Sequence, residues 1–327
     1  MTADNSLLLE ASDLAKRFAV RRGLFAKSAE MVHAVDGISF SIATGKTLGL
    51  VGESGCGKTT TAKLVLLLEQ PTGGAIRFQG HDLQTLDTAG MRNYRRSVQA
   101  VFQDPFASLN PRMRVSTIIL EPLVTNEKIS GAEAKRRVLQ LLEVVGLPDR
   151  AADLFPHEFS GGQRQRIAIA RALALSPKLV VLDEPVSALD VSIRAQILNL
   201  LRDLQAQLGL SYLFIAHDLA AVAHMSHTIA VMYLGKIVET GEADTIAKTP
   251  KHPYTQALFS AALPTHPDEQ REEIILPGEV PSPIRPPSGC RFHPRCPYAM
   301  ARCSEEEPQL LQVDGRLTAC HLYDAKP

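Results

Sequence analysis

The stretch Gly52-Glu-Ser-Gly-Cys-Gly-Lys58-Thr59 decides the fold of this chain, because it fits the pattern G-x-x-x-x-G-K-[ST]. Glycines let the backbone turn tightly and aim successive N–H groups inward, which forms a nest for phosphate oxygens. The stretch follows an apolar run, Thr47–Val51, and leads into a helical pattern, Lys58–Leu68. A buried strand, a phosphate-binding loop and a helix in this order predict an α/β P-loop NTPase core.

The side chains of this loop have the chemistry that a triphosphate needs. Lys58 would place its ammonium between the β and γ phosphates, and Thr59 would offer a hydroxyl to Mg²⁺, which prefers hard oxygen ligands. Cys56 has two interpretations, a redox-sensitive thiol at a helix N-terminus and a small residue that fills space. The residues expected to contact ATP here are Gly52, Glu53, Ser54, Gly55, Cys56, Gly57, Lys58, Thr59 and Thr60.

The pattern around the loop predicts strands that alternate with helices, and therefore a mostly parallel sheet. An antiparallel layer is expected from the alternating segments Leu7–Leu9 and Val32–Ile42, and a closing hairpin from Ile229–Tyr233 and Lys236–Glu239. The expected buried strands are Thr47–Val51, Val98–Phe102, Leu179–Leu182 and Tyr212–Ala216. The expected helices are Lys58–Leu68, the spacing within Ser116–Leu147, Gly161–Leu175 and Ser192–Leu208.

Two of the apolar strands end in residues that can do chemistry. Leu179–Leu182 leads directly into Asp183 and Glu184. Asp183 would help to bind Mg²⁺, and Glu184 would polarise the water that attacks the γ phosphate. The strand Tyr212–Ala216 leads into His217, which could report the γ phosphate through a hydrogen bond. Ligands of such sheets bind beyond the carboxyl ends of the strands, so these positions predict a hydrolytic site.

A second anion-binding helix end is predicted at Ser160-Gly161-Gly162-Gln163, where a hydroxyl and two glycines open a helix. With this motif the chain resembles the ABC ATPase family. The shared features are GESGCGKTT, Gln103 after an apolar strand, SGGQ, VVLDEP, SALD and an isolated His217, all within about residues 7–260. The resemblance implies an α-helical subdomain at about 104–165 and an antiparallel β subdomain beside the RecA-like core.

The family resemblance also implies roles for individual residues. Gln103 would sense Mg²⁺ and the attacking water. Two such domains would pair head to tail, and the helix end formed by Ser160, Gly161, Gly162 and Gln163 would contact the γ phosphate held by the partner. Phe18 would stack on adenine, at a place where family members more often carry tyrosine; the competing interpretation is an ordinary core phenylalanine. The stretch expected across the dimer seam is Ser187, Ala188, Leu189 and Asp190.

Finer features are similar to the ATPases of peptide importers. These are the stretches 102–111 and 183–192, the sequence His252-Pro253-Tyr254-Thr255 and a tail rich in cysteine and proline at 261–327. This resemblance implies two membrane permease subunits, a second ATPase subunit that is typically a paralogue, and an extracytoplasmic solute-binding protein. Dipeptides, oligopeptides, murein peptides and nickel chelates all pass through related machines, and the sequence does not choose among them.

Charge and hydropathy limit the other functions that can be considered. Lys plus Arg equals Asp plus Glu, at 35 each, which gives no indication of nucleic-acid binding. No apolar run approaches the roughly 18 residues of a membrane span, and the N-terminus does not read as a signal peptide. We therefore expect a cytoplasmic protein bound peripherally to the inner membrane. The alternatives are an ABC ATPase acting on DNA or ribosomes and a P-loop kinase or GTPase.

Four cysteines in the proline-rich tail form the last candidate site: Cys290, Cys296, Cys303 and Cys320. In a reducing compartment such a group indicates metal binding rather than disulfides. Four thiolates suit zinc or an iron–sulfur cluster, and the spacing matches no common pattern of either. The resemblance to peptide-importer ATPases favours a [4Fe–4S] cluster, with zinc or free thiols as alternatives and His321 as a spare ligand. The predicted role is structural or regulatory.

Overall fold

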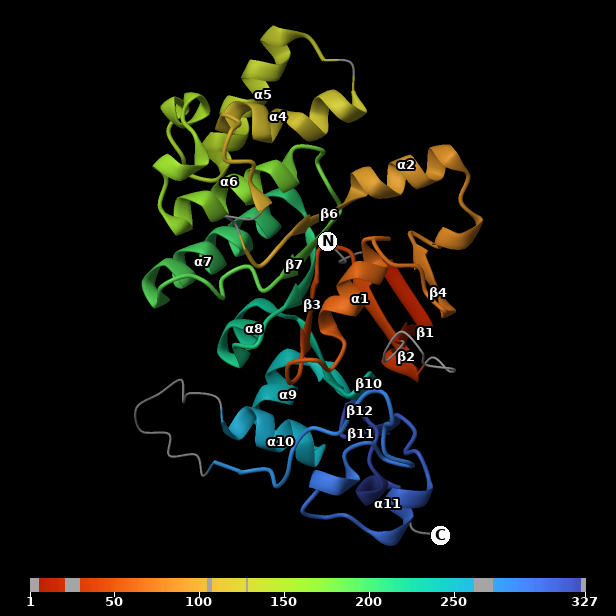
Figure 1. Cartoon of the computed structure of the whole chain (residues 1–327). Helices are drawn as coiled ribbons and strands as arrows, with labels where there is room; N and C mark the ends of the chain where they lie inside the picture. The colour runs from red at the N-terminus through yellow and green to blue at the C-terminus, as the bar shows by residue number, and fades with distance from the viewer. Residues whose placement is uncertain (1–5, 21–29, 105–107, 128, 262–272, 325–327) are drawn as a thin grey trace. The chain divides into compact units, whose positions relative to one another are not determined.

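The computed structural model describes residues 6–20, 30–104, 108–127, 129–261 and 273–324 (Figure 1). The chain divides into two compact units. The first consists mainly of residues 85–215, with the short segment 43–46, and the second joins residues 7–42, 47–84 and 216–327. The predicted domain boundary between 260 and 261 lies inside the second unit and stays a prediction.

The first unit is built on three parallel strands, as the sequence predicted. They are β6 (Val98–Val101), β7 (Leu179–Asp183) and β8 (Ser211–Ile215), with β7 paired to both neighbours. Every residue of β7 and β8 is buried, which explains why they read as continuous apolar runs rather than alternating ones. The register places Val101 beside Leu182 and Asp183 beside Ile215, so all three strands end at one edge.

Helices account for most of the remainder of the first unit. The helical spacing predicted for 116–147 is interrupted, because Ser130 starts a new helix by accepting a hydrogen bond from the N–H of Glu133 at 3.3 Å. Helix α2 was not predicted, and two short 3₁₀ turns precede α6. The helices are α2 (Thr88–Ser97), α4 (Val115–Asn126), α5 (Gly131–Val144), α6 (Gly161–Leu173) and α7 (Val191–Leu208).

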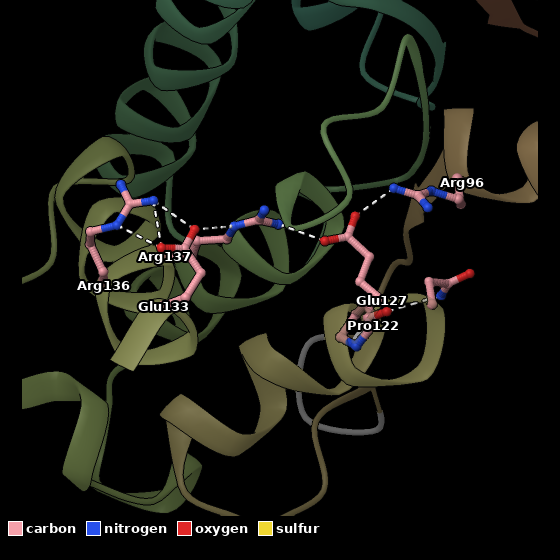
Figure 2. Close-up of polar contacts among 7 residues, drawn as sticks. Arg96, Pro122, Glu127, Glu133, Arg136 and Arg137 are labelled. Carbon is pink, nitrogen blue, oxygen red and sulfur yellow. Dashed lines mark hydrogen bonds and ion pairs between the residues drawn. The ribbon is translucent and has the colours of Figure 1, made fainter. Parts of the chain in front are cut away.

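An ion-pair chain connects α2 with the helices that follow it (Figure 2). Glu127, just past the end of α4, accepts from Arg96 of α2 at 2.5 Å and from Arg137 of α5 at 2.9 Å. Arg137 also pairs with Glu133 at 3.0 Å, and Glu133 binds Arg136 at 2.6 Å. Glu127 thereby joins two helices that are separated along the chain by α4.

The second unit contains two sheets. One is largely antiparallel and has the order β2 (Glu30–Ala43), β1 (Leu7–Val20), β4 (Gly73–Phe78) and β5 (His81–Asp82). In the other, β3 (Thr47–Val51) runs parallel to β9 (Thr228–Tyr233), and β10 (Lys236–Glu242) closes the predicted hairpin. Its turn residues Leu234 and Gly235 both have positive φ, 43° and 82°, as a tight hairpin turn requires.

Prolines exclude regular structure from only part of the C-terminal tail. Among the described residues 273–297, regular structure is limited to one 3₁₀ turn, η4 (His293–Arg295). Beyond the last of these prolines, β11 (Leu311–Val313) and β12 (Arg316–Thr318) form a hairpin, and β12 pairs with β10. The hairpin forms because the edge of β10 offers free backbone groups to a segment without proline.

Short helices complete the second unit. They are α1 (Lys58–Val65), α8 (Leu219–Met225), α9 (Ala243–Lys248), α10 (Pro253–Ser260), α11 (Ala301–Glu305) and the 3₁₀ turn η5 (His321–Tyr323). Within the ranges that the structure describes, none of the helices is both long and apolar enough to cross a bilayer.

Candidate active site

The phosphate loop lies in the second unit, between β3 and α1. Helix α1 begins at Lys58, and the residue before it, Gly57, has a φ of 113°. A Cβ at Gly57 would stand 2.2 Å from the carbonyl oxygen of Ala34, so no larger residue fits there. Lys58 Nζ donates to the carbonyl oxygens of Gly52 and Glu53 at 2.7 and 2.9 Å. The lysine is therefore held inside the loop that it would serve.

Cys56 is buried within this loop, with 4 % of its surface exposed. Burial raises the pKa of its thiol, while nearby Lys58 acts in the opposite direction. A raised pKa means less thiolate, which is the reactive form. The structure thus favours the space-filling interpretation of Cys56 over the redox-sensitive one.

The two acids lie in the first unit, at the end of β7. Asp183 is the last residue of the strand and its side chain is nearly buried. Glu184 has a φ of 51°, in the left-handed region that non-glycine residues rarely adopt. Its N–H donates to the carbonyl oxygen of Ile215 on β8 at 2.8 Å. The strained backbone turns Glu184 out of the strand direction, so adjacent acids need not point to opposite faces.

Three more of the predicted residues also lie in the first unit: Gln103, Ser187 and Asp190. Gln103 is exposed and follows β6, whose neighbour in the sheet is β7. Ser187 Oγ donates to the carbonyl oxygen of Glu184 at 3.1 Å, which ties the predicted seam to the acid. Asp190 is the N-cap residue of α7. The structure therefore brings Gln103, Asp183 and Glu184 to one edge of the parallel strands.

The predicted signature forms the N-terminus of α6. Ser160 is the N-cap: its hydroxyl accepts from the N–H of Gln163 at 3.4 Å, and its own N–H donates to the side-chain oxygen of Gln163 at 3.0 Å. This reciprocal capping box satisfies two helix-end donors. Gly161 and Gly162 are the first helical residues, so further N–H groups remain at the helix end for an anion.

Two other predicted residues lie in the second unit. His217 is exposed, and Asp218 next to it caps α8 by accepting from the N–H groups of Ala220 and Ala221 at 3.1 and 3.2 Å. Phe18 on β1 is half-buried, and the ammonium of Lys16 stands 4.9 Å from the centre of its ring. Phe18 is therefore not part of the fully buried core.

In the cysteine tail, a backbone hydrogen bond joins two of the four cysteines. The N–H of Cys290 donates to the carbonyl oxygen of Cys303 at 2.8 Å. Burial, with smaller contributions from neighbouring cysteines, raises the pKa of Cys290 to about 11 and that of Cys320 to about 12. In the described ranges, no three or more His, Cys, Asp or Glu residues are placed to hold a metal ion. Both ring nitrogens of His321 already have partners, Asp324 at 2.7 Å and the carbonyl oxygen of Glu306 at 2.9 Å.

Sequence reasoning missed two residues that contact the phosphate loop. The backbone N–H of Glu53 donates to the hydroxyl of Tyr254 at 2.8 Å, and the carboxylate of Glu53 pairs with Arg295 at 2.8 Å. The partners lie 201 and 242 positions away along the chain. The sequence His252-Pro253-Tyr254-Thr255 marked a subfamily, but nothing in it indicated contact with the loop.

Comparison with known proteins identifies the family of this chain. Residues 35–187 match the family model described as ABC transporter, and residues 238–303 match the oligopeptide/dipeptide transporter, C-terminal region. A dipeptide transport ATP-binding protein, DppF of Haemophilus influenzae, is 51 % identical over 98 % of this chain and 98 % of its own length. The oligopeptide transport ATP-binding protein AppF of Bacillus subtilis is 50 % identical over 99 % of this chain and 100 % of its own.

Solved structures support the same assignment. The ATP-binding cassette MJ0796, in a dimeric post-hydrolysis state bound to ADP and Pi, matches with a TM-score of 0.63 and 27 % identity, over 72 % of this chain and 99 % of that one. CbiO1 of Clostridium perfringens, part of the CbiONQ transporter complex, matches with a TM-score of 0.64 and 27 % identity, over 75 % and 92 %. The fold is therefore that of an ABC ATPase, and this chain belongs to the family of ABC-transporter ATP-binding proteins that carry the oligopeptide/dipeptide transporter C-terminal region.

Proposed function

We propose that this chain is the ATP-hydrolysing subunit of an ABC importer for dipeptides or oligopeptides. The observation that carries the proposal is a phosphate loop with Lys58 at the start of α1, in a chain similar over nearly its whole length to peptide-transport ATP-binding proteins. No observation favours the alternatives that act on DNA or ribosomes. Functionally, we divide the chain into a cassette at 7–260, with its helical part at about 104–165, and an extension at 261–327.

In this proposal the loop grips the triphosphate. When ATP arrives, Lys58 exchanges the carbonyl oxygens of Gly52 and Glu53 for phosphate oxygens, and the N–H groups of the loop and of α1 complete the cradle. The exchange is favourable because an ammonium pairs more strongly with a charged oxygen than with a neutral carbonyl. The ATP-contacting set keeps Ser54, Gly55, Thr60 and, for adenine, Phe18.

We propose that Thr59, Asp183 and Gln103 would bind Mg²⁺, because a hydroxyl, a carboxylate and an amide oxygen are the hard donors that this ion prefers. When bound, Mg²⁺ would neutralise charge on the β and γ phosphates. Glu184 would accept a proton from the attacking water, and His217 would hydrogen-bond the γ phosphate. The left-handed backbone at Glu184 supports this role, since it frees the side chain from the alternation of a strand, which would point it away from the face of Asp183.

The partners follow from the same reasoning. We propose that two cassettes pair head to tail, so that the α6 N-terminus of one, at Ser160, caps the ATP held by the loop of the other; the second cassette would be a paralogue. The free N–H groups at that helix end support this role. Two permease subunits would bind the pair at the cytoplasmic face of the inner membrane, and a solute-binding protein would deliver the peptide outside.

We further propose that Cys290, Cys296, Cys303 and Cys320 hold a [4Fe–4S] cluster, with zinc as the alternative. The donor set fits both by its chemistry, since four thiolates suit either group. Support comes from the backbone hydrogen bond between Cys290 and Cys303, at 2.8 Å, which brings two of the four cysteines together. When bound, the group would cross-link a segment too small to have its own core. An absorbance spectrum and metal analysis of anaerobically purified protein would distinguish iron with sulfide from zinc, and protein without either would contradict the proposal.

The decisive experiment on the main proposal is Glu184→Gln, assayed with the permeases. Turnover should fall by roughly 10²–10⁴-fold, because the general base is lost, while Mg-ATP binding remains. When ATP is present, the paired form of the cassettes should then accumulate. Asp203→Asn, on an exposed face of α7 in the same unit, is the control and should hydrolyse normally. Near-normal hydrolysis by the Glu184 variant would contradict the assignment, and co-purification with nucleic acid instead of permeases would contradict the transport function.

A further inference from the structure

The residue in the second position of the phosphate loop, Glu53, is held by the C-terminal part of the chain. Two guanidinium nitrogens of Arg295 reach the two carboxylate oxygens of Glu53, at 2.8 and 3.2 Å. Such a fork fixes direction as well as distance. The Arg295 side chain is 8 % exposed and that of Glu53 is 29 % exposed, so water screens this pair less than a surface pair.

Tyr254 holds the backbone of the same residue. Its hydroxyl accepts the N–H of Glu53 at 2.8 Å, and the tyrosine is fully buried at the start of α10. The carbonyl oxygen of Glu53 accepts a third contact, from Lys58 Nζ at 2.9 Å. The side chain, the N–H and the C=O of Glu53 each have a partner, so its conformation is determined on every side.

Both holding residues depend on one aromatic cluster. Phe292 has 1 % of its surface exposed. The centre of its ring lies 5.5 Å from the ring centre of Tyr254 and 5.2 Å from that of Tyr233. The N–H of Arg295 donates to the carbonyl oxygen of Phe292 at 3.0 Å, which ties the turn η4 to this cluster. Packed rings do not shift easily, so Arg295 and Tyr254 reach the loop from a rigid base.

We infer that Arg295 is a positioning residue for ATP binding: through its fork with Glu53 it holds the phosphate loop in the conformation that receives the triphosphate. The inference rests on the proposed function only in requiring that this loop binds ATP. A preformed loop does not lose conformational entropy when the nucleotide binds, and its affinity for ATP is therefore higher. The extension thereby contributes to a site that its sequence position, beyond residue 260, does not suggest.

The test compares Arg295→Gln with a matched control in the full-length chain. Arg285→Gln removes another ion pair of the extension, with Glu30 at 2.9 Å, that does not involve the loop. For Arg295→Gln we expect the dissociation constant and the KM for Mg-ATP to rise about ten-fold, with kcat changed less than about two-fold, because a lost buried fork weakens binding but leaves Glu184 in place. Arg285→Gln should leave all three constants unchanged.

A double-mutant cycle separates positioning from simple loss of stability. Glu53→Gln should weaken ATP binding to the same extent, and the double variant should be no weaker than either single one, because both remove one interaction. Arg295→Lys retains the charge without the fork, and should give an intermediate affinity even if Arg295→Gln folds poorly. Unchanged ATP affinity in the folded Arg295 variants, or additive losses in the cycle, would overturn this inference and leave the proposed function standing. Failure of the unmodified chain to bind ATP would overturn the proposed function as well.

Discussion

The hydroxyl of Tyr254 accepts the backbone N–H of Glu53 at 2.8 Å, so a residue of α10 is a hydrogen-bond partner of the phosphate loop. An amide of such a loop would otherwise be unsatisfied next to a buried side chain, and an unmade buried hydrogen bond costs more than a formed one contributes. Tyr254 also packs its ring against Tyr233, with 4.7 Å between the ring centres. One side chain thus links the core of the second unit to the loop.

Tyr254→Phe removes this acceptor and keeps the ring. We expect a loss of about 1–2 kcal/mol in the free energy of unfolding, because the Glu53 N–H loses its partner. Mg-ATP affinity should fall as well, measured by titration calorimetry. The control is Tyr212→Phe, another buried tyrosine whose hydroxyl donates to the carbonyl oxygen of Leu201 at 2.8 Å. It should lose similar stability without losing affinity; equal affinities in both variants would show that Tyr254 does not act on the loop.

Lys58→Met tests the phosphate cradle itself. The variant keeps an unbranched side chain, one atom shorter, but removes the charge, so Mg-ATP binding should weaken by at least about 100-fold, on the scale of a lost charge-assisted contact. Lys63→Met, on the exposed face of the same helix, should bind normally. Equilibrium binding of a fluorescent ATP analogue measures both. Retained binding by the Lys58 variant would mean that phosphate is held elsewhere.

His252 makes stability depend on pH. Burial lowers its pKa to about 3, against about 6.5 in an unfolded chain. Between these values the unfolded state binds the extra proton, so stability is complete above about pH 6.5 and falls as the pH drops toward 3, by at most about 1.4 kcal/mol per pH unit. The backbone N–H of His252 donates to the buried carboxylate of Glu239, at 2.9 Å.

The measurement is urea unfolding at pH 7 and pH 5, compared with His252→Asn. Asparagine can replace the ring nitrogen that accepts the N–H of Tyr254 at 3.1 Å, because it is a good N-cap, but it does not titrate. The unmodified chain should lose about 2 kcal/mol between the two pH values beyond what the variant loses. The same pH dependence in both proteins would exclude His252 as its source.

The ion-pair chain centred on Glu127 should make a small contribution to the free energy of unfolding, and this contribution should depend on the salt concentration. Glu127→Gln removes the partner of both Arg96 and Arg137. Since these side chains are partly exposed, we expect a loss of about 1 kcal/mol or less at low salt, shrinking as salt is added. This loss of stability would be measured as faster amide hydrogen exchange in α4 and α5. Glu143→Gln, an exposed residue of α5, is the control; a salt-independent loss would point to packing instead.

Much of the fold could be read from local pattern. The apolar runs at β3, β6, β7 and β8 and the glycine loop were predicted nearly to the residue, because strand and helix periodicity are short-range properties. The hairpin of β9 and β10 was equally visible through Leu234-Gly235. Helix α2 was missed, and the single helical pattern over 116–147 is two helices, because the N-cap at Ser130 was not recognised.

The predicted site was also local in origin. The residues predicted to bind phosphate or Mg²⁺ and to catalyse hydrolysis lie mostly at the end of a strand or the start of a helix, where the chain itself presents side chains and N–H groups. The structure adds what no motif contains: the left-handed backbone at Glu184 and the capping box between Ser160 and Gln163. The strain at Glu184 persists because the hydrogen bond to Ile215 and the surrounding packing hold it.

The sequence by itself determined that this chain has a glycine-rich phosphate-loop motif, two acids at the end of an apolar strand and a cysteine-bearing tail, because each is a local pattern of the chain. Only the tertiary structure decided that Tyr254 and Arg295 meet Glu53, and that β12 extends the sheet at β10. Tyr254 and Arg295 lie 201 and 242 positions from Glu53 along the chain. Contacts over such separations depend on how the whole second unit packs, and local periodicity contains no information about that packing.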